Sequence, residues 1–177
     1  IVNTVGNGLT YVPDDLFEQE LVSLGYDDEV DDYVLTENIA SVTSLDVSQK
    51  GISDLTGIED FIALTNLRCF LNNLNSLDIS NNVALTSIEY SNNNISELDI
   101  SKNLALTYLG GNTNNLNSID LSKNIALTDI RLTNNNLNDL DVSTSILLTR
   151  IDCAGNNLNV LDISKNTALK GLFCYGN

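Results

Sequence analysis

The chain has 177 residues and a formal net charge of −16, from 24 acidic and 8 basic side chains. It contains no histidine, which excludes a catalytic triad built on imidazole and any histidine-based metal site. Residues 1–60 carry a net charge of −13 (14 acidic, 1 basic) and residues 61–177 a net charge of −3 (10 acidic, 7 basic). This acidic excess argues against nucleic acid and anionic membranes as partners, because both select clustered lysine and arginine.

Residues 1–41 have the features of a cap for the repeats that follow. Residues 1–10, with Asn, Gly and Thr, predict an extended or loose entry segment. Residues 12–25 predict a helix, since Asp14 or Asp15 can cap its first turn and Gly25 can end it. The apolar face of this helix can cover the core of the first repeat, so we expect residues 1–41 to form an N-terminal helical cap.

An acidic segment follows, with five carboxylates in the six positions 27–32. Carboxylates this close repel one another unless they are solvated or bound to a cation, so a calcium site with Asp27, Glu29 and Asp31 as ligands is conceivable. The segment lacks the Gly and the terminal Glu of the twelve-residue calcium loop, which favours a solvated acidic loop. Residues 36–41 then predict a short helical turn.

From residue 64 to the C-terminus one 21-residue phrase recurs without a gap, preceded by a related coil of 22 residues at 42–63. Its first position is always Leu, and its fourth and eleventh are Leu or Ile. Its ninth is always Asn: Asn72, Asn93, Asn114, Asn135, Asn156 and Asn177. One coil cannot bury its own apolar face, so the coils must stack. We expect the asparagine side chains to bond to backbone groups that an interior turn would leave unpaired.

This LxxLxxxxNxL spacing resembles the leucine-rich repeat, and its short form resembles the IRREKO-type and internalin-type repeats of bacterial surface proteins. The resemblance covers roughly residues 42–177. It implies an α/β leucine-rich repeat solenoid, right-handed and related to the horseshoe proteins, with six to seven coils of which the last is incomplete. The second half of each repeat follows the same rule, which predicts a second short strand on the back and little curvature.

Three other columns of the repeat have structural interpretations. The sixth position points inward and holds Cys69, Cys153 and Cys174, which resemble the cysteine ladder of some internalins and are expected to be buried free thiols. At Gly111 the same column leaves a hole that the Tyr90 ring can fill. The fifteenth position is Asp in all five full copies, and we favour a structural column bonded to turn N–H groups over a row of metal sites.

The third, fifth and seventh positions point outward from the strands and vary from coil to coil. Exposed aromatic residues beside arginine are typical of interaction surfaces. The predicted ligand-binding residues are Phe70, Tyr108, Asp129, Arg131, Arg150 and Asp152.

No catalytic set is visible in the sequence, so we expect neither an enzyme nor a bound cofactor other than the conceivable calcium. The internalin resemblance implies a secreted or cell-surface bacterial module that recognises a protein or glycan through its strand face, as in adhesion. No apolar run approaches the ~18 residues of a membrane span, so we expect no membrane insertion, and we expect a monomer. The alternatives are a structural spacer or shield, or an accessory module fused to a secreted enzyme. A search for a reproducible ligand distinguishes the binding module from the spacer.

Overall fold

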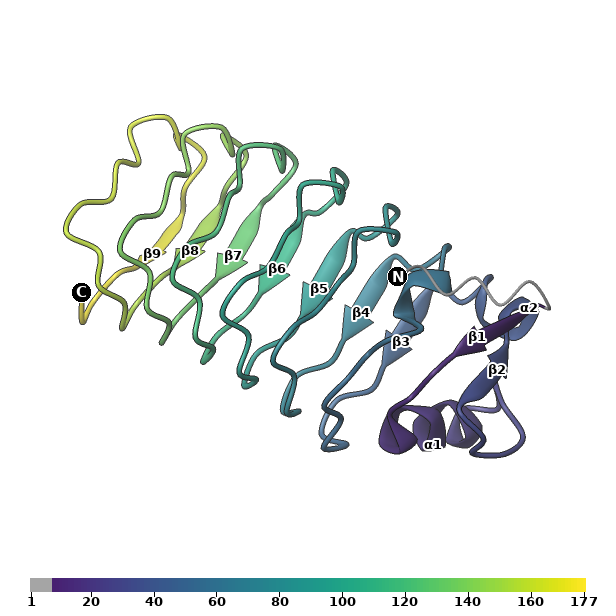
Figure 1. Ribbon diagram of the computed structural model, residues 1–177. Coiled ribbons are helices and arrows are strands. Elements are labelled where there is room, and N and C mark those ends of the chain that lie inside the picture. Colours follow the sequence, from purple (N-terminus) through teal and green to yellow (C-terminus); the bar gives the residue numbers. More distant parts are fainter. Residues whose placement is uncertain (1–7) are drawn as a thin grey trace.

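The computed structural model describes residues 8–177 as an elongated stack of coils with a small α/β cap at one end (Figure 1). The expectation for residues 1–7 lies outside the described residues. In chain order the elements are β1 (Leu9–Tyr11), α1 (Asp15–Ser23), β2 (Tyr33–Leu35), α2 (Thr36–Ile39), β3 (Ser44–Asp46), the 3-10 helix η1 (Ile58–Asp60), β4 (Asn66–Arg68), β5 (Ser87–Glu89), β6 (Tyr108–Gly110), β7 (Asp129–Arg131), β8 (Arg150–Asp152) and β9 (Gly171–Phe173).

Strands β3 to β9 form one parallel sheet in which the spatial order equals the sequence order. Between β4 and β5 Leu67 lies opposite Ile88, an offset of 21 residues. Between β3 and β4 Ser44 lies opposite Asn66, an offset of 22 residues. The predicted period, the longer first coil and the leucine-rich repeat solenoid are therefore confirmed.

The core is a set of aliphatic columns that run the length of the stack. In the coil that begins at residue 64, the inward side chains Leu64, Leu67, Leu74 and Ile79 are all fully buried. Burying one such side chain contributes roughly 1.5–3 kcal/mol, so most of the stabilisation comes from contacts between neighbouring coils.

The ninth-position asparagines form a ladder, as predicted, and all of them except Asn177 in the last coil are buried. Asn93 Nδ2 donates to the carbonyl oxygens of Cys69 (3.0 Å) and Tyr90 (2.9 Å), while Asn93 Oδ1 accepts from the N–H of Leu74 (3.0 Å). Each asparagine thus bonds within its own coil and to the coil before it. Equivalent bonds are made by Asn72, Asn114, Asn135, Asn156 and Asn177.

The sixth-position column also packs as expected along most of its length. Tyr90 is fully buried, and a Cβ added to Gly111 would overlap the Tyr90 ring, so this ring fills the space that glycine leaves. Cys69 and Cys153 are buried free thiols, whereas Cys174, in the last coil, is exposed.

The predicted second strand on the back of each coil is wrong for the described residues: strands there occur only on the β3–β9 side and in the cap. The backbone groups that a second ladder would use are bonded by side chains instead. The N–H of Ser101 donates to Asp99 (2.8 Å), and Asn103 Nδ2 donates to the Ile79 carbonyl (3.0 Å). The same aspartate bond confirms the structural reading of the column Asp78, Asp99, Asp120, Asp141 and Asp162.

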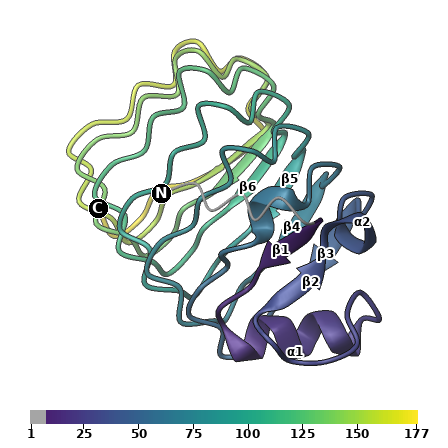
Figure 2. The same ribbon diagram turned by 45° about the vertical axis from the view of Figure 1, so that its right-hand side comes forward.

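The cap combines an antiparallel β1–β2 pair with α1 and α2 at the open end of the first coil (Figure 2). Helix α1 begins after Asp14, whose carboxylate accepts the N–H groups of Leu16 and Phe17, both at 3.0 Å. The Phe17 ring lies 6.4 Å from the Phe61 ring of the first coil, centroid to centroid. Neither helix of residues 8–177 combines the length and apolar character that crossing a bilayer requires.

The buried Glu18 organises the acidic segment. Its carboxylate, inaccessible to solvent, accepts the N–H groups of Asp31 (3.0 Å), Asp32 (3.0 Å) and Tyr33 (2.8 Å). One carboxylate inside the cap therefore holds the acidic loop against α1.

Candidate functional site on the strand face

The strand face consists of the outward side chains on and just after β4–β9. Five of the six predicted ligand-binding residues lie on the adjacent strands β6, β7 and β8: Tyr108, Asp129, Arg131, Arg150 and Asp152. Phe70 follows β4, and β5 separates it from this group. The structure therefore brings five of the predicted residues together and leaves the sixth outside the centre.

The two arginines at the centre are held by aspartates. Arg131 donates to Asp129 through Nε (3.2 Å) and Nη2 (2.9 Å), and Arg150 donates to Asp152 through Nη2 (3.2 Å). Arg150 Nε lies 4.0 Å from Asp129 Oδ1, which links the two pairs. The bonds to Asp129 raise the pKa of Arg131. The four charges cancel, so the centre offers fixed polar geometry and little net charge.

Tyr108 lies between opposite charges on its neighbouring strands. Its ring centroid is 5.3 Å from the Arg131 Cζ, within the range of a cation–π contact. Its hydroxyl donates to the Glu89 carboxylate, and a Cβ on Gly110 would overlap both partners of that bond. Burial, together with this bond, raises the pKa of Tyr108. Gly110, the last residue of β6, thus makes room for the tyrosine side chain to lie across the strand.

A chain of hydrogen bonds extends the site from β5 to β8. The Ser91 hydroxyl donates to Glu89 and accepts from the N–H of Asn112 (2.9 Å). Asn112 Oδ1 accepts from the N–H of Thr133 (2.9 Å), whose hydroxyl donates to Asp152. The prediction missed these four polar residues, although their outward fifth and seventh positions place them in the same register as those chosen.

Two further arginine–aromatic pairs flank the centre. Arg68 Cζ lies 5.2 Å from the Phe70 ring centroid, and Arg68 also contacts Asp46, with Nε 3.3 Å from Oδ2. At the other end Arg150 Cζ lies 4.3 Å from the Phe173 ring centroid. Arginine beside an aromatic ring therefore recurs along the strand face.

The cysteines and the acidic loop are weaker candidates for a functional site. Burial raises the pKa of Cys69, and burial with the nearby Cys174 raises that of Cys153 to about 11, so both stay thiols near neutral pH. In the acidic loop, burial followed by Asp28 and Asp31 raises the pKa of Asp27. Within residues 8–177 no group of three or more acidic or cysteine side chains is placed to hold a metal ion. The calcium site stays a prediction.

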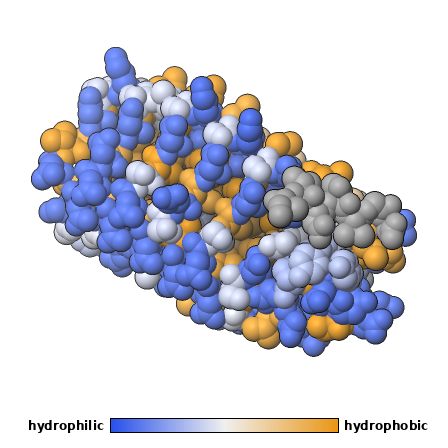
Figure 3. Space-filling view, viewed as in Figure 1, coloured by the Kyte–Doolittle hydropathy of each residue, from blue (hydrophilic) through white to orange (hydrophobic). Residues whose placement is uncertain are grey.

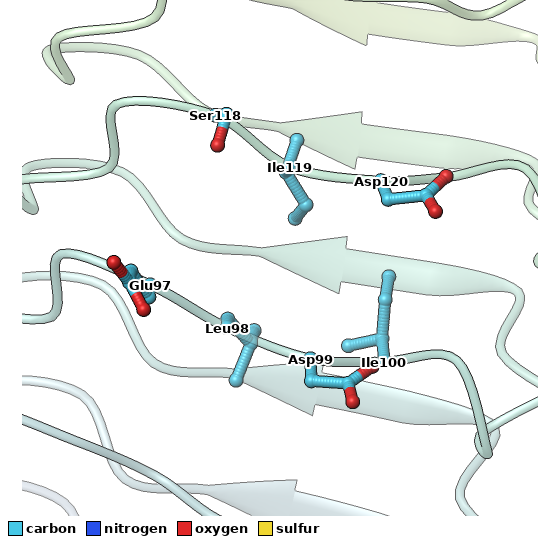
Figure 4. Close-up of a pocket in the computed structure, with 7 residues that line it drawn as sticks. All are labelled: Glu97, Leu98, Asp99, Ile100, Ser118, Ile119 and Asp120. Carbon is cyan, nitrogen blue, oxygen red and sulfur yellow. The ribbon is translucent and has the colours of Figure 1, made fainter.

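A shallow hollow of about 290 Å³ lies on the back between two coils (Figure 4). It is lined by Glu97, Leu98, Asp99, Ile100, Ser118, Ile119 and Asp120. Asp99 and Asp120 already accept the N–H groups of Ser101 and Ser122, each at 2.8 Å. Two of its carboxylates are thus bonded within the fold, and we place the candidate site on the strand face.

Comparison with known proteins finds similarity to bacterial leucine-rich repeat proteins. No family model matches the chain. Two forms of internalin J of Listeria monocytogenes, serotype 4b and serovar 1/2a, are 40% and 37% identical over 72 and 87 residues, which cover 41% and 46% of this chain. These segments are only 8% and 10% of the relatives' own length.

Solved structures match over most of the chain. The functional domain of InlJ from Listeria monocytogenes, described as including a cysteine ladder, superposes with a TM-score of 0.63 at 29% identity, over 94% of this chain and 47% of that one. An internalin of the same species, inlF, gives 0.85 at 25% identity, over 92% and 49%. A leucine-rich repeat protein of Leptospira interrogans gives 0.75 at 22% identity, over 80% and 39%, and supports the fold alone. The chain spans about half the length of the two internalin structures.

Proposed function

We propose that this chain, which is similar to the leucine-rich repeat domains of internalins, is a non-catalytic binding module of a secreted or cell-surface bacterial protein. Its ligand is a protein or glycan that lies on the strand face, with Tyr108, Arg131 and Arg150 at the centre of the contact. The module binds as a monomer, in an adhesion-type role.

The arrangement of charge and hydrogen bonds across β5–β8 supports this proposal most strongly. The inward first, fourth and eleventh positions repeat Leu or Ile, whereas the outward positions differ on every strand and are joined in one network from Glu89 to Asp152. A side chain already held in position loses little conformational entropy when a ligand binds, which favours recognition over mere solubility.

The first experiment is a search for the ligand, using a glycan array and crosslinking to proteins of the native surroundings. We expect at least one ligand that binds reproducibly and saturably. If neither method yields one, the strand face serves only as a spacer or shield.

The second experiment locates the contact once a ligand is in hand. Arg131→Ala combined with Arg150→Ala should weaken binding at least tenfold, because it removes both central cations and leaves Asp129 and Asp152 without an arginine partner. Glu97→Ala, an exposed change on the back, is the matched control and should bind normally. Unchanged binding by the double variant would remove the strand-face centre from the proposal.

A further inference from the structure

A straight row of exposed aliphatic side chains lies along one edge of the solenoid, away from the strand face. It comes from the twentieth position of the first four repeats and the equivalent position of the first coil, while the fifth repeat has Thr167 there. Its members are between 54% and 61% exposed: Ile62, Val83, Leu104, Ile125 and Ile146. We name these residues the aliphatic row, and Figure 3 shows hydrophobic side chains recurring along the upper edge of the molecule.

The row is held rigidly at the spacing of the coils. Leu104 lies in a tight turn closed by the N–H of Leu106, which donates to the Asn103 carbonyl (3.2 Å). The buried Asn103 ties this turn to the preceding coil, since its Nδ2 donates to the carbonyls of Ile79 (3.0 Å) and Asn82 (2.9 Å). Neighbouring members are therefore separated by about the strand spacing of ~4.8 Å.

Lysines border this row in an otherwise acidic molecule. Lys102 and Lys123 each stand two residues before an aliphatic member, and Lys165 continues the line in the next-to-last coil. All three are exposed. In the described part of the chain, the ion pairs within 4.0 Å involve Lys50 and the three arginines and none of these lysines. Each lysine also helps to lower the pKa of the aspartate three residues before it, Asp99, Asp120 or Asp162, so its charge is shared between that carboxylate and a partner.

We propose that the aliphatic row is a second docking surface, and that its occupant is an amphipathic helix of a partner protein with acidic side chains beside its apolar stripe. A regular line of exposed Ile, Leu and Val is unusual on a monomeric surface and marks a protein contact. The flanking lysines select an acidic partner by charge.

The spacing of the row selects a helix. Helical turns repeat every ~5.4 Å, close to the ~4.8 Å between coils, so three steps of the row match about ten helical residues. Side chains on one face of an extended strand repeat every ~6.7 Å and would lose register after one coil. A glycan would leave the row's methyl groups without apolar partners.

The aliphatic row and the strand face share no residue. A column of threonines at the second position lies between them in sequence; one of these, Thr107, donates its hydroxyl to the carbonyl of Thr86 (3.0 Å). The inference therefore goes beyond the binding proposed for the strand face and does not depend on it.

The test uses the full chain and a fluorescent synthetic 15-residue peptide, with leucine at alternating third and fourth positions and glutamate on its flanks. Two control peptides have the same composition in scrambled order, or lysine in place of glutamate. Fluorescence anisotropy should detect binding of the first peptide only. Leu104→Ser with Ile125→Ser should weaken it at least tenfold, and Lys102→Glu with Lys123→Glu should weaken it most at low salt.

Val160→Ser is the matched control, because Val160 is 75% exposed but lies outside the row. It should bind the peptide normally, as should Arg131→Ala with Arg150→Ala, which separates this test from that of the strand face. Circular dichroism checks that each variant is folded. The proposal would be overturned if the ordered peptide did not bind, or if it bound no better than the scrambled one. Full binding by a folded variant with Leu104→Ser and Ile125→Ser would also overturn it.

Discussion

At the eighth position of each repeat the backbone adopts a left-handed conformation, with φ between 54° and 72°. Asn92, Asn134, Gly155 and Gly176 tolerate this conformation. Thr113 does not suit it, because its branched Cβ is close to the following carbonyl oxygen when φ is +55°. Leu71 has the same conformation, with φ at +56°, so the column contains two points of backbone strain.

We predict that Thr113→Asn stabilises the protein by about 1 kcal/mol, the order of the left-handed penalty for a side chain of this kind. Thr113 is exposed, so the change disturbs few contacts. The midpoint of urea denaturation measures the effect. Thr144→Asn, at an exposed position without positive φ, is the control and should change stability by less than about 0.5 kcal/mol.

The asparagine ladder predicts that substitution of one of its members lowers the stability of the protein substantially. In Asn114→Ala the N–H of Ile95 and the carbonyl of Tyr90 lose their bonds to the side chain, at 3.0 and 3.1 Å. Each buried group left unpaired costs about 1–3 kcal/mol, so we expect a loss of at least ~2 kcal/mol in the free energy of unfolding. Asn94→Ala changes an exposed asparagine and should be nearly neutral. Similar losses in the two variants would contradict the ladder as a source of stability.

At the scale of elements, one carboxylate joins the cap to the solenoid. Asp14 caps α1 and also accepts the N–H and hydroxyl of Ser53, both at 2.8 Å, and the N–H of Asp54 at 3.1 Å. Burial opposes ionisation of Asp14, but these bonds and that from Phe17 together lower its pKa. Helix α1 and the first coil therefore share a single anchoring group.

Asp14→Ala should lower the free energy of unfolding by about 2 kcal/mol, the upper range for a helix N-cap, because it also removes the bonds from Asp14 to the first coil. A double-mutant cycle with Ser53→Ala measures the interaction energy between Asp14 and Ser53. We expect this coupling energy to be at least ~0.5 kcal/mol. Additive effects of the two substitutions would mean that Asp14 acts on its own helix alone.

The repeat phase, the inward columns and helix α1 could be predicted from the sequence because each rests on local periodicity or capping. The β1–β2 pair and the clamp made by Glu18 could not, because they join segments that no short pattern relates. The prediction of a second strand on the back was wrong because Asp99 and Asn103 bond the backbone groups that a β-ladder needs. The site centre was predictable from outward register, but which neighbours bond, such as Tyr108 with Glu89, depends on the space beside Gly110.

At the scale of the whole molecule, acid acts in opposite directions on its two parts. Acidification reduces repulsion in residues 1–60, where the net charge is −13. The raised pKa of Asp27 also makes acid stabilising, since this carboxyl binds its proton more readily in the folded state than in the unfolded state. The cap should therefore gain stability as the pH is lowered toward about 4, below which protonation of Asp14, whose pKa is lowered, removes its anchoring contribution.

The repeats should lose stability in stronger acid. Hydrogen bonds from the serine two residues later lower the pKa of Asp99, Asp120, Asp141 and Asp162. A carboxyl with a lowered folded pKa stabilises the fold above its unfolded pKa of about 3.9, and this contribution disappears as the pH falls through the folded value. Denaturation at a series of pH values should show a loss below about pH 4.

Replacing both central members of this column tests the assignment. Asp99→Asn with Asp120→Asn keeps the oxygen that accepts the serine N–H but removes the titration, so stability should fall less steeply between about pH 4 and pH 2. Hydrogen exchange resolves the two parts of the molecule, and the difference should appear in the repeats while the cap behaves as in the unmodified protein. An identical pH slope in the variant would mean that the aspartate column does not set the acid sensitivity, and would leave the charge of the cap as its source.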